Sequence, residues 1–267
     1  MPGVPVITLT TDFGYKDPLA AIMKGVILGI NPSVNIVDIT HLVGKYQVRE
    51  AALIIGMSYR EFPARSIHVA VTDPGVGSPR RPLLVEAEGH YFIGPDNGVF
   101  SMVYLEAGTF RATHLTSTHY FGPKRSTTFH GRDIFAPVAA WLSKGIESSK
   151  FGEPITDFVK FDIPSPSFSS ANALEGEVIY IDTYGNAITN IRVEDIEKLR
   201  FSRPDGTMRA VVKGKEASLK QYYEQAGERG LYALVNSMDR LEFFVYRGDA
   251  SREYGIAVGD PVGIILR

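Results

Sequence analysis

Val69–Val85 reads VAVTDPGVGSPRRPLLV, an apolar, β-prone run that stops at Asp73 and gives way to a loop rich in proline and glycine. The pattern predicts a buried strand, a tight turn and a second strand. Ligands of open α/β sheets bind beyond the carboxyl ends of strands, so an acid placed there is a good candidate for function. Pro74 stiffens the loop, which allows Asp73 and Arg80 to meet across it. The alternative is that Asp73 only caps its own turn while Arg80 points into solvent.

The composition limits the classes of protein that the chain can represent. Its 267 residues are 44% hydrophobic, enough for one large domain or two smaller ones. A formal net charge of −2 without a basic stripe argues against a surface for nucleic acid or anionic membrane. The absence of cysteine excludes disulfides, thiol nucleophiles and thiolate metal sites. With no signal-like start and no run of about 18 apolar residues, we expect a cytoplasmic protein with small-molecule partners.

The first half of the chain alternates between expected strands and expected helices. Three apolar runs end in polar loops and read as strands, at 4–9, 34–39 and 67–71. Helical spacing lies between them, at 18–27 and 46–59. This alternation predicts an α/β domain built on a mainly parallel sheet. The loops of these strands carry Asp12, Asp38 with His41, and Asp73. Farther on, Glu88-Gly89 predicts a hairpin over 83–93, and 99–106 reads as a short helix.

Thr127–Asp133, TTFHGRD, is the second stretch dense in reactive side chains, and it precedes an apolar helix expected at 134–142. His130 sits just before the helix start, among arginine and aspartate, which favours a functional histidine over a structural one. A metal site is the competing interpretation, with candidate ligands His114, His119, His130 and Asp133. The spacing of these residues matches no HExxH-type or other paired signature, so we expect no metal.

The composition changes near the middle of the chain. Residues 164–173 are rich in proline, serine and alanine, which is typical of a linker between a domain at 1–163 and a second one at 174–267. The second part holds many short β-prone runs, which predicts a small barrel or sandwich. Its turn at 181–190 combines Tyr184 with amides, a set suited to a purine-like ring, although an ordinary hairpin with Gly185 at positive φ explains it equally well.

Five motifs occur together and in one order along nearly the whole chain. They are TDFG at 11–14, DPGVG at 73–77 with Arg80, FHGRD at 129–133, YGNAITN at 184–190 and Asn236-Ser237. In these motifs the chain resembles the S-adenosyl-L-methionine (SAM) hydroxide adenosyltransferases, the adenosine-forming SAM hydrolases related to fluorinase and chlorinase. The resemblance implies an N-terminal α/β domain, a C-terminal β-barrel domain and a homotrimer. It places the sites between the N-terminal domain of one subunit and the C-terminal domain of its neighbour.

The resemblance also implies roles for particular residues. Asp73, Arg80 and His130 resemble the set that holds and activates a water molecule. The substrate-binding positions would be Asp12 for the ribose diol, Tyr46 for the sugar or the methionine portion, Asp182 and Asn186 for methionine, and Tyr184 beside adenosine. Ser237 and Arg247 also match binding positions, whereas Met238 stands where the halide-using relatives carry an arginine. SAM is then the substrate, adenosine and L-methionine are the products, and no cofactor is needed.

The expected chemistry is displacement of methionine from the ribose C5′ of SAM by water. Either His130 or Asp73 could take the proton from that water, and the sequence leaves both open. A halogenase is disfavoured, because an anionic Asp73 about 4 Å from a halide would cost about 4 kcal/mol at an effective dielectric constant of about 20. Gly131 supplies no hydroxyl donor for a halide either. The other alternative is a non-catalytic protein that binds SAM or adenosine, which would have no use for the Asp-Arg-His set.

Overall fold

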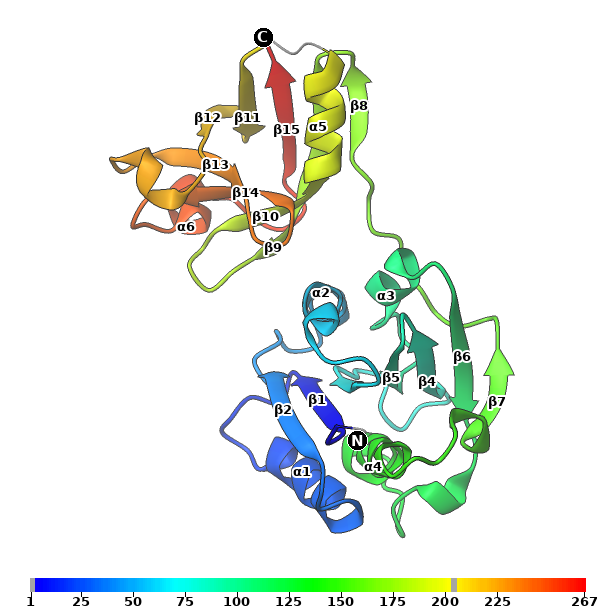
Figure 1. The fold of residues 1–267 in the computed structure, drawn as a ribbon. Coiled ribbons are helices and arrows are strands. Elements are labelled where there is room, and N and C mark those ends of the chain that lie inside the picture. The colour runs from blue at the N-terminus through cyan, green and yellow to red at the C-terminus, as the bar shows by residue number, and fades with distance from the viewer. Residues whose placement is uncertain (1–2, 203–205) are drawn as a thin grey trace. The chain divides into compact units, whose positions relative to one another are not determined.

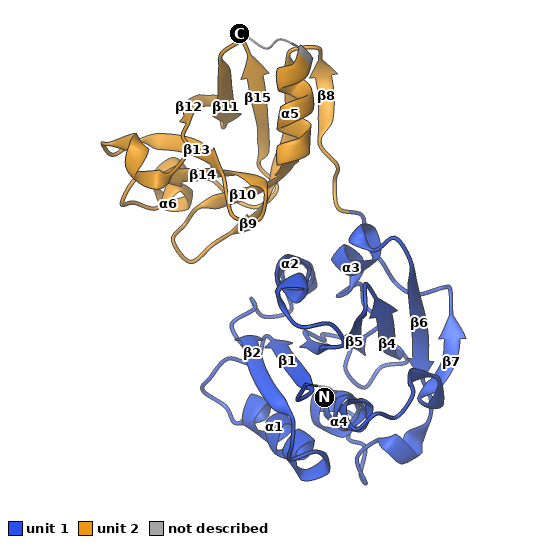
Figure 2. Cartoon of the chain, viewed as in Figure 1, with its two compact units in different colours: residues 1–162 blue, residues 163–267 orange. Residues whose placement is uncertain are grey.

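The computed structural model describes residues 3–202 and 206–267, and the chain divides into two compact units. Unit 1 is Met1–Asp162 and unit 2 is Ile163–Arg267 (Figure 1, Figure 2). Unit 1 is an α/β domain, and unit 2 is a β-barrel with short helices. The fold class expected from the sequence is therefore confirmed. In the part of the chain that the structure describes, no helix is long and apolar enough to span a membrane.

Unit 1 is built on a seven-stranded sheet with the strand order β2-β1-β3-β5-β4-β6-β7. The strands are β1 (Val6–Thr11), β2 (Asn35–Thr40), β3 (Ile67–Val71), β4 (Pro82–Ala87), β5 (His90–Pro95), β6 (Phe110–Leu115) and β7 (Gly152–Ile155). The first four in that order pair in parallel, whereas β4, β6 and β7 add antiparallel pairs, so the sheet is mixed. The predicted hairpin causes the change, because a two-residue turn reverses the chain. Glu88 and Gly89 both have positive φ, at 50° and 75°, as that turn requires.

Two pairs of helices cover the two faces of this sheet (Figure 1). They are α1 (Leu19–Ile30) with α4 (Ala136–Ser143), and α2 (Val48–Ser58) with α3 (Ser101–Glu106). Met23 and Val138 of the first pair pack in one core with Leu9 of β1. Ile55 and Val103 of the second pair belong to a separate core. Since both faces are covered, the central strands β1, β3, β5 and β4 are largely buried, and groups accessible to a ligand lie at their ends.

A pair of histidines is buried in the sheet of unit 1. His68 of β3 is 1% exposed, and its ring lies 2.8 Å from the Thr8 hydroxyl and 3.3 Å from the ring of His90. Burial lowers the pKa of His68 to about 3, and the charge of a protonated His90 lowers it further. The folded protein therefore requires the neutral form of His68.

We expect this requirement to destabilise the fold in acid. His68 has a folded pKa of about 3, below the ordinary value of 6.5, so its contribution is complete above pH 6.5 and is lost as the pH falls toward 3. Between pH 7.5 and 4.5 the loss amounts to about 2–3 kcal/mol of unfolding free energy. Urea unfolding at both pH values measures it, and His68→Gln should remove that part of the pH dependence. His119 is exposed, so His119→Gln serves as the control and should show the same pH dependence as the wild type. If His68→Gln lost as much unfolding free energy in acid as the wild type, the assignment to His68 would be contradicted.

Unit 2 is a barrel closed by seven strands, with an eighth strand attached beside it. The strands are β8 (Ser167–Ser170), β9 (Ala173–Ile181), β10 (Ala187–Arg192), β11 (Met208–Val212), β12 (Lys215–Leu219), β13 (Leu231–Val235), β14 (Arg240–Val245) and β15 (Pro261–Leu266), and the helices are α5 (Val193–Ser202) and α6 (Ala250–Tyr254). The order β10-β14-β13-β12-β11-β15-β9 closes because β10 also pairs with β9. The barrel interior is apolar, with Val178, Ala210 and Phe243 in its core.

The stretch 164–173, expected to be a linker, contains strand β8. The long strand β9 pairs with β10 only through its second half, from Val178 onward. Its first half, around Leu174, would leave backbone groups unpaired at an open edge, and Phe168 of β8 pairs there. The composition of the segment did not reveal this, because the need for a partner arises in β9.

Candidate active site

Asp73 and Arg80 meet across the loop that follows β3. Arg80 Nε donates a hydrogen bond of 3.0 Å to Asp73 Oδ1, and Arg80 Nη2 donates to Asp73 Oδ2. The two side chains are 4% and 9% exposed, so this bidentate ion pair is largely removed from water. Gly77 in the same loop has a φ of 80°, and a Cβ there would lie 2.1 Å from the carbonyl oxygen of Thr127. Only glycine allows the loop to approach the 127–130 segment so closely.

His130 joins this ion pair from a segment 50 residues farther along the chain. Its Nδ1 atom lies 2.7 Å from Arg80 Nη2. A guanidinium group offers only donors, so Nδ1 must accept, and the proton of the neutral ring resides on Nε2. Burial lowers the pKa of His130, and the charge of Arg80 lowers it further. Arg80 therefore fixes both the carboxylate and the tautomer of the histidine.

Asp133 shapes the segment that carries His130. Its Oδ2 accepts hydrogen bonds from the amide and the hydroxyl of Ser126, at 2.7 and 2.8 Å, and Arg132 binds Oδ1 at 2.6 Å. Residues 131–135 form a π-helical turn that leads into α4. Gly131 is buried in this turn, and a Cβ there would approach Met23 Sδ to 3.0 Å. Close packing thus accounts for glycine at position 131, independently of any halide site.

Asp12 also contacts Tyr46, through the backbone amide of Tyr46 and not through its aromatic ring. Asp12 follows β1, and its Oδ2 accepts a hydrogen bond of 2.9 Å from the amide of Tyr46. Tyr46 has a φ of 65°, which is uncommon outside glycine, and its side chain is 70% exposed. The aromatic ring is therefore presented to solvent beside a half-buried carboxylate.

The expected methionine-binding residues lie in one turn of unit 2, between β9 and β10. Asp182 Oδ1 accepts from the amides of Tyr184 and Asn186, and Asp182 Oδ2 accepts from the side chain of Asn186 at 3.1 Å. The Tyr184 side chain is 76% exposed, and Gly185 has a φ of 80°. The Asp182 carboxylate thus stabilises the turn that follows it and also orients the side chain of Asn186.

The two remaining predicted binding residues, Ser237 and Arg247, are exposed turn residues. Ser237 lies in the turn between β13 and β14, and the guanidinium of Arg247 lies 5.2 Å from the centre of the Tyr246 ring.

Glu242 of β14 is a buried acid that the sequence analysis did not single out. It is 3% exposed and accepts hydrogen bonds from the Tyr223 hydroxyl and the side-chain amide of Asn236. Burial raises its pKa, and so does the charge of Asp182. The only sequence signal was a single acid inside the apolar run LEFFV.

Family models match both units of the chain. The SAM hydroxide adenosyltransferase N-terminal domain matches residues 7–152, and the C-terminal domain of the same family matches residues 176–263. The chain belongs to this family. The resemblance inferred from the five motifs is therefore confirmed.

Relatives of this SAM hydroxide adenosyltransferase family member match it over nearly its full length. A protein named (R)-S-adenosyl-L-methionine hydrolase from Methanocaldococcus jannaschii is 33% identical over 97% of this chain and 95% of its own. A fluorinase from Nocardia brasiliensis is 30% identical over 97% of each chain. The crystal structure of an uncharacterized conserved protein from Thermotoga maritima matches with a TM-score of 0.90 and 33% identity, over 97% of this chain and 99% of that one.

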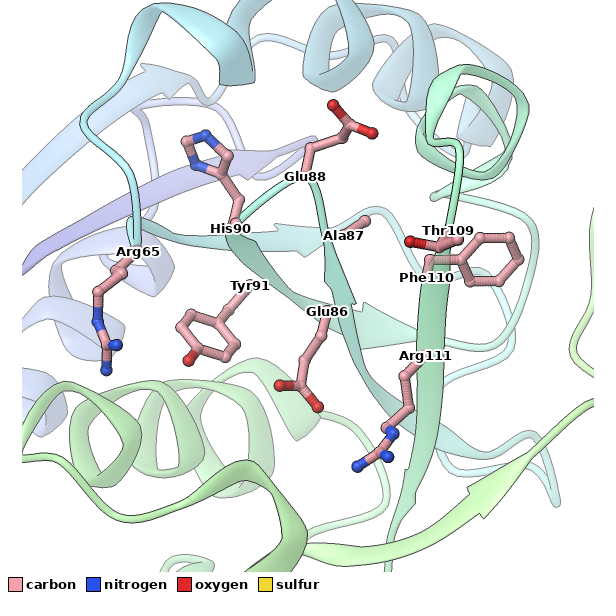
Figure 3. Close-up of a pocket in the computed structure, with 10 residues that line it drawn as sticks. Arg65, Glu86, Ala87, Glu88, His90, Tyr91, Thr109, Phe110 and Arg111 are labelled. Atoms are coloured by element: carbon pink, nitrogen blue, oxygen red, sulfur yellow. The ribbon is translucent and has the colours of Figure 1, made fainter.

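A pocket of about 440 Å³ is lined by residues other than Asp73, Arg80 and His130. Figure 3 shows the side chains that line it. Glu86, Tyr91 and Arg111 stand side by side on three neighbouring strands and line it, together with Arg65. Arg65 precedes β3 whereas Asp73 follows it, so the pocket and the ion pair lie at opposite ends of that strand. Within 3–202 and 206–267, no three histidine, aspartate or glutamate residues gather as a metal site.

Proposed function

We propose that this protein hydrolyses SAM to adenosine and L-methionine. The observation that carries the proposal is the contact of Arg80 with both Asp73 and His130, in a chain that belongs to the SAM hydroxide adenosyltransferases. The family relationship supports the substrate, since relatives that match the whole chain are named SAM hydrolases. The geometry supports a site that orients and deprotonates a water molecule.

The reaction forms a C5′–O bond and breaks the C5′–S bond. Water supplies the electron pair for the new bond, the electrons of the C–S bond return to sulfur, and the water loses one proton. The sulfonium becomes a neutral thioether, so the leaving group needs no acid. Positioning a water molecule in line with C5′ can lower the barrier by up to about 7–11 kcal/mol, and a general base adds about 10²–10⁴-fold.

The hydrogen bonds of Arg80 support Asp73 as the proton acceptor. His130 Nδ1 is already bound to Arg80, and Nε2 carries the ring proton, so the neutral histidine has no free lone pair for the water proton. Each oxygen of Asp73 accepts one hydrogen bond from Arg80 and keeps a further lone pair. His130 then donates from Nε2 to the water oxygen and orients it, while Asp73 takes the proton. The proposal therefore takes Asp73 as the base, a choice that the sequence left open between Asp73 and His130.

The binding of SAM itself follows from the family resemblance. Asp12 is proposed to bind the ribose diol, with Tyr46 beside the sugar or methionine portion. The proposed contacts from unit 2 are Asp182 and Asn186 with methionine, Tyr184 with adenosine, and Ser237 and Arg247 at neighbouring positions. A homotrimer with sites between subunits is part of the same proposal, and light scattering on the purified protein would determine its mass.

Incubation of the purified protein with SAM in ¹⁸O-water tests the proposed function. The buffer contains no added metal or halide, and the products are analysed by mass spectrometry. We expect adenosine that carries ¹⁸O at its 5′ position and unlabelled L-methionine, beyond the amounts formed in a parallel incubation without protein. Adenosine without the label would exclude attack by water at C5′. Intact SAM that co-elutes with the protein would instead indicate a binding protein, and 5′-chloro-5′-deoxyadenosine formed on adding chloride would indicate a halogenase.

A further inference from the structure

A buried histidine that the proposed chemistry does not use joins the loops that follow β1 and β2. His41 comes directly after β2 and is 1% exposed. Its Nδ1 atom lies 2.8 Å from the hydroxyl of Thr11, the last residue of β1. Its carbonyl oxygen accepts a hydrogen bond of 2.7 Å from the amide of Gly14. The ring and the backbone of His41 thus bind the loop that carries Asp12 on both sides of that residue.

A charged pair below the ring fixes the orientation of His41. Asp38 Oδ1 lies 3.1 Å from His41 Nε2, and Asp38 Oδ2 lies 2.5 Å from Lys24 Nζ. Burial raises the pKa of Asp38, but Lys24 and His41 outweigh burial and hold that pKa below its ordinary value. The carboxylate is therefore ionised, and Nε2 carries a proton, since its lone pair would otherwise lie 3.1 Å from an anionic oxygen. Nε2 and Oδ1 are not aligned as a hydrogen bond, so their attraction is mainly electrostatic.

With the proton on Nε2, the neutral ring of His41 accepts at Nδ1, and Thr11 donates its hydroxyl proton there. The hydroxyl oxygen in turn accepts from the amide of Phe13 at 3.3 Å. Polar contacts therefore run without interruption from the amide of Phe13 to Lys24. Because these groups are buried or half-buried, each contact is worth more than it would be in water.

The polar contacts that link Phe13, Thr11, His41, Asp38 and Lys24 form what we call the His41 bridge. The position of the Asp12 carboxylate depends on this bridge. Asp12 lies between Thr11 and Phe13, both of which the bridge holds, and its Oδ2 accepts from the amide of Tyr46. The amide of Val43 donates to the carbonyl of Thr11, which ties the second loop to the first. Tyr46 adopts a strained backbone conformation, which persists only if the surrounding contacts hold it. Removing the ring of His41 would release both loops and let the carboxylate move.

We propose that His41 is a positioning residue that holds Asp12 for the ribose diol and so sets the preference for substrates with both ribose hydroxyls. The inference rests on the proposed function, because it takes SAM as the substrate and Asp12 as the group that binds its ribose. His41 does not touch the reacting atoms. Its effect should therefore appear in binding, in which the ground state and the transition state share the same diol contact.

Steady-state kinetics with SAM and with its 2′-deoxy analogue test this inference. The variants are His41→Asn, which keeps a polar group near Nδ1, His41→Leu, which removes both polar contacts, and Thr11→Val, which removes the hydroxyl. For His41→Leu and Thr11→Val we expect KM for SAM to rise about tenfold with kcat within about twofold, and KM for the deoxy analogue to change little. His41→Asn should recover part of the loss. In an Asp12→Ala background, His41→Leu should raise KM no further.

A merely structural role would give a different result. Loss of folded protein lowers kcat for both substrates and leaves KM unchanged, and that outcome would overturn the inference. His90→Gln is the matched control, because His90 is also a buried histidine, is 7% exposed and lies outside these loops; it should affect thermal stability without changing the preference for the diol. If the wild type does not hydrolyse SAM, the proposed function fails. Equilibrium binding of the two ligands then decides the inference by itself. A loss of affinity for SAM but not for the deoxy analogue in His41→Leu, relative to the wild type, supports it. Affinities of His41→Leu that equal those of the wild type contradict it.

Discussion

Replacing Asp73 with asparagine should lower kcat for SAM hydrolysis by about 10²–10⁴-fold and leave the affinity for SAM within a few-fold. Asparagine has nearly the shape of aspartate but cannot accept a proton from water. It also presents an NH₂ group to Arg80, whose nitrogens only donate, so one of the two hydrogen bonds between these side chains is lost. Single-turnover kinetics and a separate binding measurement distinguish loss of chemistry from loss of binding.

The chain provides a closely matched control for this substitution. Asp96 is also a buried aspartate, and it pairs with Arg81, the residue next to Arg80. Its other oxygen accepts from the amide of Val159, so its contacts are structural. Asp96→Asn should lower the unfolding temperature but leave kcat nearly unchanged. If Asp73→Asn and Asp96→Asn had the same effect on kcat, the loss in Asp73→Asn would reflect stability, and Asp73 would not be the base.

Replacing Arg80 with methionine should reduce kcat by about 10³-fold, a loss within the range expected for Asp73→Asn. Removing one preorganised donor typically costs about 10²–10³-fold, and Arg80 both orients Asp73 and sets the tautomer of His130. The substitution also leaves a buried carboxylate without its partner, which costs about 3–5 kcal/mol of stability. Arg80→Lys keeps the charge but not the fork of donors, so it should recover stability better than activity. Urea unfolding and kcat, measured on the same preparations, separate the two effects.

The same variant should change the pH dependence of hydrolysis. In the wild type, burial and the charge of Arg80 lower the pKa of His130, so the ring stays neutral and Nδ1 can accept from Arg80. Without the guanidinium that pKa rises, and the charge of Asp73 also raises it. A protonated His130 would attract the Asp73 carboxylate and make it a weaker base, so the acid limb of the kcat/KM profile should move to higher pH. Arg81→Met is the control, because Arg81 pairs with Asp96 and Asp157 instead. An acid limb that stays in place in Arg80→Met would show that the titration of His130 does not govern the rate.

The proposed role of His130 as a donor differs from the usual part of a catalytic histidine. The difference arises from its neighbour. Where a histidine faces a carboxylate, the ring nitrogen on that side carries the proton and the other nitrogen is free to act as a base. Here the ring faces a guanidinium, which places the ring proton on Nε2, and the proposed mechanism therefore takes the Asp73 carboxylate as the base.

Local sequence was sufficient for the elements that depend on local patterns. Val69–Val71 is a continuous apolar run that is followed by a proline-glycine loop, and it forms the end of the buried strand β3. Glu88-Gly89 allows positive φ at two successive residues, and the predicted hairpin forms there. Both features depend on residues within a few positions of each other. For the second domain the local patterns left a barrel and a sandwich open, and the family resemblance indicated the barrel.

The sequence by itself thus determined the alternation of strands and helices in unit 1, the short strands of unit 2 and the acids at the strand ends. Tertiary structure decided which groups from distant parts of the chain meet. The contact of Arg80 with His130 joins positions 50 residues apart, and the bond of His41 to Thr11 joins positions 30 apart. Strand β8 likewise forms only because β9 offers an open edge. The physical reason is common to all three: a hydrogen bond depends on separation in space, and packing of distant segments, rather than the order of residues, sets that separation.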